Sequence, residues 1–163
     1  MAEENPTEIS YQRARFATRL PTDRRYTAGH YWLRLRAGEE GTVWEVGLTK
    51  FATRMLGDLV EYEFEVKPGA LVKVGQTLGW IEAFKAVTDI IGVMEGEFVG
   101  GNPELESNID AVMQDPYGKG WLYAVRGQPD AQSVDAVGYV NILDSTIDKM
   151  RGPQGGDSPK GTP

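Results

Sequence analysis

Alternation of hydrophobic and polar residues is clearest at residues 59–66, in the middle of the chain. Three glutamates there separate the apolar residues Val60, Tyr62, Phe64 and Val66. Successive side chains of a strand point to opposite faces, so this pattern predicts a strand with one apolar and one acidic face. β-rich or alternating runs predict further strands at residues 31–36, 42–48, 77–84, 86–94, 98–99 and 121–125.

Turns and two helices are predicted around these strands. Thr49 is placed to cap a short helix that runs to Met55 and ends at Gly57. Residues 133–150 have apolar residues at partly helical spacing, although Gly138 weakens that pattern. Residue types that favour turns occur at residues 67–69, 75, 95–97 and 100–103. We therefore expect a mainly β fold, a small sandwich or barrel, with peripheral helices and a C-terminal helix.

Three segments are expected along the chain. Residues 1–25 are polar without sustained periodicity, and we interpret them as an N-terminal extension that packs locally through Tyr11, Phe16 and Leu20. Residues 26–150 form one compact domain. The remaining residues, 151–163, are rich in Gly, Pro and Ser, a composition typical of disordered tails.

The composition excludes several kinds of site. The 163 residues include no cysteine and a single histidine, His30, so disulfides, thiolate metal sites, cysteine nucleophiles and histidine clusters are excluded. His30 is expected to be structural or to contact a partner, and Asp144 and Asp148 are expected to be surface charges. No nucleophile–base pair or metal cluster can be assembled, which argues against an independent enzyme.

Charge and hydropathy restrict the partners and the location. The formal net charge is −7, and residues 27–150 hold ten basic and nineteen acidic side chains. An acidic body disfavours nucleic acid and anionic membranes as partners. No apolar run is long enough to cross a bilayer, and no secretory signal is visible. Acidic residues among the first eight argue against an organelle transit peptide, so we expect a cytoplasmic protein.

One lysine, Lys85, lies between two β-rich runs in the segment Glu82-Ala83-Phe84-Lys85-Ala86-Val87-Thr88-Asp89. A lysine in this position belongs at a hairpin tip, where its amine projects into water. Once deprotonated, such an amine can attack an activated acyl group and form a stable amide. Taken alone, the segment is better explained by an ordinary surface lysine, because such lysines are common.

The lysine segment is one of several motifs that occur in a fixed order. The others are His30-Tyr31-Trp32-Leu33, Val46-Gly47-Leu48-Thr49, Leu56-Gly57-Asp58-Leu59-Val60, Gly96-Glu97, Asn102-Pro103, Pro116-Tyr117 and Gly120-Trp121. With these motifs, residues 26–127 resemble the H proteins of the glycine cleavage system. The resemblance implies a barrel-sandwich hybrid of the lipoyl-domain type.

The resemblance also implies a role for Lys85. It implies a carrier protein whose lipoate is attached covalently to Lys85, within a lipoylation motif that includes Glu82, Ala86 and Asp89. Biotin domains typically place the lysine between two methionines, whereas Lys85 lies between Phe84 and Ala86. The lipoyl arm would carry an S-bound intermediate between partner enzymes, and lipoate-attaching enzymes would be further partners.

Three positions depart from the family pattern. The family binds its aminomethyl-loaded arm in a cleft with Ser, Glu and His, where this chain has Gly29, Tyr31 and Phe51. A cationic amine needs acceptors and negative charge, so these changes make such a cleft less suitable. Asp89 retains the acid at the end of the lysine motif.

The cargo of the arm therefore has two interpretations. The chain is expected to resemble the H-protein-like lipoate-binding proteins that carry sulfur beside heterodisulfide-reductase-like complexes. Alternatively, it is an H protein that carries aminomethyl between the glycine cleavage P, T and L proteins. A third possibility, from another class, is an unlipoylated binding or scaffold protein that has kept the fold.

Overall fold

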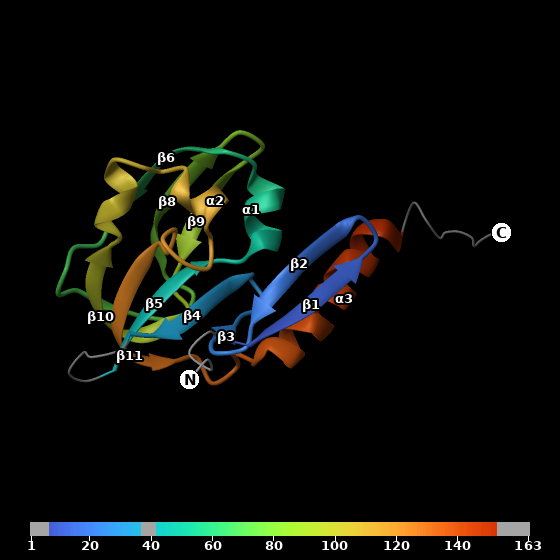
Figure 1. Cartoon of the computed structure of the whole chain (residues 1–163). Coiled ribbons are helices and arrows are strands. Elements are labelled where there is room, and N and C mark those ends of the chain that lie inside the picture. Colours follow the sequence, from blue (N-terminus) through green and yellow to red (C-terminus); the bar gives the residue numbers. More distant parts are fainter. Residues whose placement is uncertain (1–6, 37–41, 153–163) are drawn as a thin grey trace.

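The computed structural model describes residues 7–36 and 42–152, which form two packed sheets, an N-terminal hairpin and peripheral helices (Figure 1). The larger sheet has the strand order β3-β4-β5-β11-β10-β7 and the smaller one β6-β8-β9, and every pairing is antiparallel. The strands of the larger sheet are β3 (Arg25–Tyr26), β4 (Tyr31–Leu35), β5 (Val43–Leu48), β7 (Leu71–Val72), β10 (Met94–Gly101) and β11 (Tyr123–Pro129). Those of the smaller sheet are β6 (Leu59–Phe64), β8 (Thr77–Ala83) and β9 (Val87–Ile91).

The two sheets share one hydrophobic core. Leu33, Val46 and Phe98 of the larger sheet and Ile81 and Ile90 of the smaller sheet belong to the same buried cluster. Inward-facing apolar side chains from two sheets that meet in this way make a barrel-sandwich hybrid, which confirms the fold expected from the sequence.

The helices lie at the periphery of the sheets. The chain contains α1 (Lys50–Leu56), a 3-10 helix (Pro103–Glu106), α2 (Ala111–Gln114) and α3 (Ala136–Arg151). Thr49 caps α1 by accepting a hydrogen bond from the backbone N–H of Ala52, and Gly57 ends the helix, both as expected. Among the described residues, none of the helices has the length and apolar character that a bilayer span requires.

The N-terminal segment contains a hairpin that its polar composition does not suggest. Strands β1 (Glu8–Arg13) and β2 (Phe16–Pro21) pair in antiparallel register and pack against α3. Figure 1 shows this hairpin lying along α3, beside the sheets. Its buried residues Tyr11, Phe16 and Leu20 are the ones expected to pack, and their cluster includes Tyr139 and Leu143 of α3. We call β1, β2 and α3 the hairpin–helix unit.

Two expected turns are strand residues instead. Glu95-Gly96-Glu97 lies inside β10, where Gly96 pairs with Val72 on one side and Gly127 on the other. A Cβ on Gly96 would lie 2.1 Å from the carbonyl oxygen of Arg126, so this glycine permits close approach of two strands and does not mark a turn. Gly100 and Gly101 likewise end β10 after a register shift, and the chain turns only at Asn102.

Other element boundaries differ by a few residues. The run expected at 86–94 is divided, because β9 ends at Ile91 and Met94 already belongs to β10. The last strand begins at Tyr123 and continues to Pro129. Arg151, expected in the tail, is the last residue of α3, and residues 153–163 lie outside the described part of the chain.

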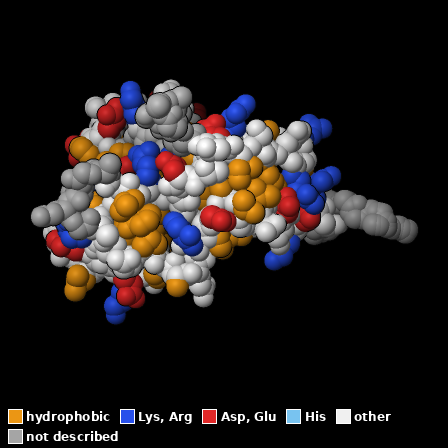
Figure 2. Space-filling model, turned by 60° about the horizontal axis from the view of Figure 1, so that its bottom comes forward, with side chains coloured by type: hydrophobic (Ala, Val, Ile, Leu, Met, Phe, Trp, Pro, Cys, Tyr) orange, Lys and Arg blue, Asp and Glu red, His pale blue; other side chains and the backbone are white. Residues whose placement is uncertain are grey.

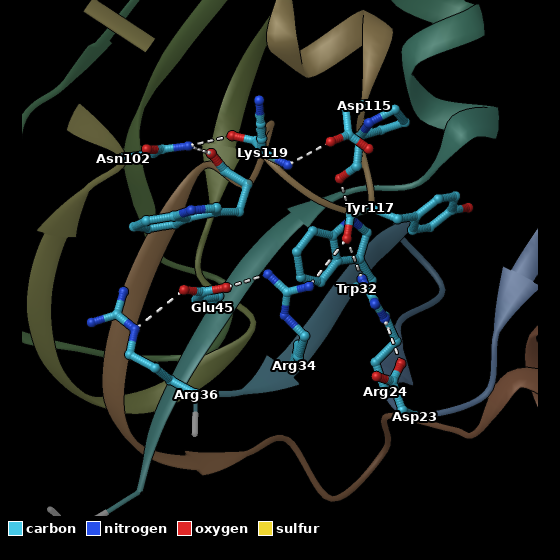
Figure 3. A network of polar contacts seen from close by, with 12 residues as sticks. Asp23, Arg24, Trp32, Arg34, Arg36, Glu45, Asn102, Asp115, Tyr117 and Lys119 are labelled. Atoms are coloured by element: carbon cyan, nitrogen blue, oxygen red, sulfur yellow. Dashed lines mark hydrogen bonds and ion pairs between the residues drawn. The ribbon is translucent and has the colours of Figure 1, made fainter. Parts of the chain in front are cut away.

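A polar network ties the segment around residues 115–121 to the larger sheet (Figure 3). Arg24 donates to the carbonyl oxygen of Tyr117, and Trp32 Nε1 donates to that of Pro116. The guanidinium of Arg24 also lies over the Trp32 ring, with 4.7 Å between its Cζ and the ring centroid. These half-buried hydrogen bonds help to fix the buried Trp32 between the sheet and the hairpin–helix unit.

The surface carries both signs of charge. On the face seen in Figure 2, basic and acidic side chains are interspersed, and hydrophobic atoms gather in a few patches. In the described part of the chain, no group of His, Cys, Asp and Glu is arranged to hold a metal ion.

Candidate functional site

Lys85 occupies the tip of the β8–β9 hairpin. The last residue pair of the ladder is Glu82 with Val87, and the backbone N–H of Ala83 donates to the carbonyl oxygen of Ala86 to close the turn. Lys85 is exposed, as are its neighbours Phe84 (83%) and Val87 (73%). The sequence-based position of Lys85 on a hairpin tip therefore agrees with the structure.

Backbone hydrogen bonds hold this tip against the segment that follows α1. The N–H of Phe84 donates to the carbonyl oxygen of Asp58, and the N–H of Lys85 donates to that of Leu56, both at 2.8 Å. The tip thus has two tertiary attachments in addition to its own turn. An attachment point held in this way keeps its position while the side chain above it moves.

Gly57 makes the close contact between α1 and the tip possible. Its φ is +77°, a conformation that side chains rarely adopt, and it lies between the two carbonyl groups that receive the tip. A Cβ at this position would lie 3.1 Å from Cγ of Lys85 and 3.4 Å from Cβ of Phe84. The motif Leu56-Gly57-Asp58 therefore acts as a backbone cradle for Lys85.

The amine of Lys85 is accessible to an acylating enzyme. Its Nζ donates to the carbonyl oxygen of Arg54 at 3.2 Å, and no described carboxylate forms an ion pair with it. Amide formation removes the positive charge of Lys85 Nζ, and no buried ion pair is lost with it. The amide keeps one N–H, which can still donate a hydrogen bond. The site therefore fits a lipoyl group in amide linkage.

The other residues of the motif lie on the same hairpin at different distances from the tip. Asp89 pairs with Trp80 across the two strands, and Trp80 and Glu82 are two residues apart on β8. Glu82 and Asp89 therefore project from the same sheet face. Both acids are exposed, and so is Ala86. Asp89 is four residues from Lys85, which corresponds to roughly 13 Å along a strand, and it lines a cleft of about 400 Å³.

The three positions that depart from the family pattern lie close together. Gly29 and Tyr31 line the 400 Å³ cleft with Asp89, and Gly29, Tyr31 and Phe51 line an adjoining cleft of about 190 Å³. The Tyr31 hydroxyl accepts a hydrogen bond from the N–H of Ile91 at 3.1 Å, and burial raises the pKa of that hydroxyl. This wall is consequently aromatic and uncharged beside Asp89.

His30 lies behind this wall and contacts the hairpin–helix unit. The Tyr139 hydroxyl is 2.8 Å from His30 Nδ1 and 2.8 Å from Thr49 Oγ1. The His30 ring also packs against Phe51, with 4.7 Å between ring centroids. Burial lowers the pKa of His30 to about 4, so the imidazole is neutral at pH 7. These contacts support the structural role expected for His30.

Sequence reasoning missed the residues that support Lys85. The carbonyl groups of Arg54, Leu56 and Asp58 receive the tip, but a backbone acceptor has no signature in a sequence. Gly57 was identified only as the end of a helix. Its second role follows from packing with a hairpin that comes some thirty residues later in the chain.

These features define a carrier site: an accessible amine on a rigid tip beside an open cleft. The sequence model described as "Glycine cleavage H-protein" matches residues 24–141. The chain belongs to this family, which confirms the resemblance seen in the motifs and the prediction of lipoate as covalently bound cofactor.

Individual relatives support the same assignment over most of their length. The glycine cleavage system H protein of Corynebacterium jeikeium is 38% identical over 75% of this chain and 95% of its own. That of Bordetella pertussis is 40% identical over 74% of this chain and 94% of its own. The crystal structure of the H protein from Mycobacterium marinum, 32% identical, superposes with a TM-score of 0.68 over 77% of this chain and 99% of its own.

The family match also separates the two parts of the molecule. Residues 24–141 include the two sheets and the beginning of α3. The hairpin β1–β2 and the last turns of α3 lie outside the match. The hairpin–helix unit is therefore mostly an addition to the family domain.

Proposed function

We propose that this chain is the lipoyl carrier of a glycine cleavage system and that Lys85 bears the lipoyl group. The observation that carries this proposal is the exposed amine of Lys85 on a tip attached to Leu56 and Asp58. When bound, lipoate supplies a disulfide ring at the end of a flexible arm, which can take up and release a fragment. The partners would be the P, T and L proteins of that system, because the relatives are glycine cleavage system H proteins.

In this proposal the chain positions the arm and catalyses no step itself. The backbone cradle keeps the origin of the arm fixed, and the exposed side chains of Glu82, Ala86 and Asp89 are recognised by the lipoate-attaching enzyme. Tethering then raises the effective concentration of the arm at each docked partner. The fixed origin supports this role because a mobile origin would enlarge the volume that the arm explores.

Intact mass spectrometry tests the attachment site. Chain produced with a lipoate-attaching enzyme should gain the mass of one lipoyl group, and Lys85→Arg should abolish that gain. Lys73→Arg is the matched control, because Lys73 is also an exposed lysine near a turn. A gain that survives Lys85→Arg would refute the site. An unmodified wild-type chain would favour an unlipoylated binding or scaffold protein.

A second candidate, transport of a sulfur cargo beside heterodisulfide-reductase-like proteins, is favoured by one observation. Where the family cleft has Ser, Glu and His, this chain has Gly29, Tyr31 and Phe51, which leaves Asp89 and Asp130 as the carboxylates among the described residues that line the larger cleft. The names of the relatives favour glycine cleavage instead. Reconstitution with P, T and L proteins separates the two, because a lipoylated chain that does not restore glycine decarboxylation would exclude the first candidate.

A further inference from the structure

A pocket of about 210 Å³ lies between the tip of the N-terminal hairpin, α1 and the end of α3. Its apolar lining includes Phe16, Met55, Ile147 and Met150, and its basic lining includes Arg15 and Arg54. We call it the hairpin pocket. Residues of the hairpin and of the end of α3 lie outside the family match, so most of this pocket belongs to the added unit.

The lining is apolar, yet it is open to water. Met55 and Met150 are 46% and 48% exposed, and here they lie in one pocket, so that their thioethers are available to a ligand. The guanidinium of Arg54 lies 5.9 Å from the centre of the Phe16 ring. Neither Arg15 nor Arg54 forms an ion pair with a carboxylate of the described residues. The pocket therefore combines exposed thioethers and an aromatic ring with uncompensated positive charge.

The pocket lies next to the origin of the arm. Lys85 Nζ donates to the carbonyl oxygen of Arg54, and both Arg54 and the following residue, Met55, line the pocket. A group attached to Nζ consequently begins next to the backbone of a residue that lines the pocket. An apolar cavity of about 150 Å³ can hold benzene, so 210 Å³ has room for a five-membered ring.

We propose that the hairpin pocket receives the disulfide ring of the lipoyl group on Lys85 when no partner is bound. This inference rests on the proposed function. Sulfur packs favourably against the edge of an aromatic ring and against thioethers, which the pocket supplies through Phe16, Met55 and Met150. Once a two-electron reductant such as an external dithiol has opened the ring to the dithiol, with two protons taken up, the guanidiniums of Arg15 and Arg54 favour the thiolate form of its sulfurs.

The clefts at Tyr31 are the competing position for the ring. The smaller of them shares Phe51 and Met55 with the hairpin pocket, whereas Met150 lines the hairpin pocket and neither cleft. They also carry the carboxylates of Asp89 and Asp130, which disfavour a thiolate. The two positions can therefore be distinguished through the two methionines.

The first experiment uses full-length chain with ¹³C-labelled methionine methyl groups, lipoylated and unmodified. Intact mass first establishes that Lys85 carries the group, so a failure of the proposed function is recognised separately. Lipoylation should then shift the methyl resonances of both Met55 and Met150, while that of Met94, fully buried in the barrel core, stays in place. A shift of Met55 alone would put the ring in the clefts at Tyr31, and a shift of neither would mean a free arm. Either result would overturn the proposal.

Two variants of α3 make this test specific. Met150→Glu places a charge in the hairpin pocket and should abolish the lipoylation-dependent shift of Met55. Val137→Glu is the matched control, because Val137 is 63% exposed on the same helix and does not line the pocket. If Met150→Glu keeps the shift of Met55 while its thermal unfolding remains cooperative, the ring does not enter the pocket.

The second experiment tests how the positive charge of the pocket affects the thiol pKa of the reduced arm. The pH dependence of iodoacetamide alkylation reports the thiol pKa of the arm. Arg15→Gln should raise its midpoint by roughly half a pH unit, the effect of one nearby charge. Arg19→Gln is the control, since Arg19 is an exposed hairpin arginine that lies outside the pocket. Equal midpoints in Arg15→Gln and wild type would refute the contribution of the guanidiniums.

Discussion

The barrel, by which we mean the two packed sheets with α1, and the hairpin–helix unit are held together by different kinds of contact. In the barrel, Lys85 and Phe84 are attached through backbone hydrogen bonds, and the strands are paired over long registers. The hairpin is attached to α3 mainly through side chains, among them Arg13 with Asp148 and Tyr11 with Asp144. Backbone attachment depends little on side-chain identity, whereas side-chain attachment depends on each residue.

This difference accounts for what each part contributes to function. The barrel supplies a fixed point for the arm, which every carrier of this kind requires. The hairpin–helix unit adds a surface beside that point without changing how the lysine is held. Changes in the barrel should therefore affect folding and lipoylation, while changes in the unit should affect where the arm rests.

The largest expected effect concerns Trp32, which joins the two parts. Its ring is fully buried, its Nε1 donates to Pro116, and a Cβ on Gly47 would lie 2.4 Å from it. Trp32→Ala should lower the free energy of unfolding by about 3–5 kcal/mol, because a large cavity would remain. Urea denaturation measures this loss. Trp80→Ala, at a half-buried position, should cost clearly less, and equal losses would contradict a joining role for Trp32.

The second prediction concerns His30 and the pH dependence of stability. Its pKa is lowered to about 4 in the folded state from the model-peptide value of 6.5. Between these values the unfolded chain binds a proton that the folded chain does not. Stability should therefore fall by about 2–3 kcal/mol as the pH decreases from 6.5 to 4.

His30→Asn isolates this effect from the titration of carboxylates. The chain has no other histidine, and asparagine tolerates the positive φ of 74° at this position. The difference in unfolding free energy between wild type and His30→Asn should decrease toward low pH. A difference that is constant from pH 7 to pH 4 would show that His30 titrates alike in both states.

The third prediction concerns the cradle of the barrel. Gly57→Ala should destabilise the chain by about 1–2 kcal/mol because φ is +77° there, and it should slow lipoylation because the new Cβ meets Lys85. Gly69→Ala is the control, with φ +97° and no atom within 4 Å of the new Cβ. Mass spectrometry of a lipoylation time course should show slowing only for Gly57→Ala. Equal slowing in both would assign the effect to backbone strain alone.

The smallest effect is expected for the exposed ion pair of the unit. Arg13 contacts Asp148 at 2.9 Å, and this pair lowers the pKa of Asp148. Solvent screens such pairs, so Arg13→Ala should lower Tm by no more than about 2 °C. The Tm difference from wild type should shrink in 1 M salt. A larger loss that persists in salt would mean that the Arg13 side chain supports the hairpin by packing.

Local patterns predicted the centre of the site. The β-rich runs around Lys85 predicted a hairpin tip, and Thr49 and Gly57 predicted the start and end of α1. The segment at 95–97 was predicted wrongly because its Gly-containing sequence also suits a strand that closely approaches another strand. The N-terminal hairpin was missed because its apolar residues, Tyr11, Phe16 and Leu20, are few and are buried by contacts with α3, which lies far away in the sequence.

The sequence by itself determined the family, the fold class, the lysine at the hairpin tip and the aromatic replacements at Tyr31 and Phe51. These depend on residue identity and on periodicity within short segments. Only the tertiary structure decided that Lys85 is held by the carbonyl groups at the C-terminal end of α1 and just after it, and that a pocket lies near its amine. Backbone acceptors carry no residue code, and that pocket joins residues 13–16, 51–55 and 147–151, whose proximity follows from packing alone.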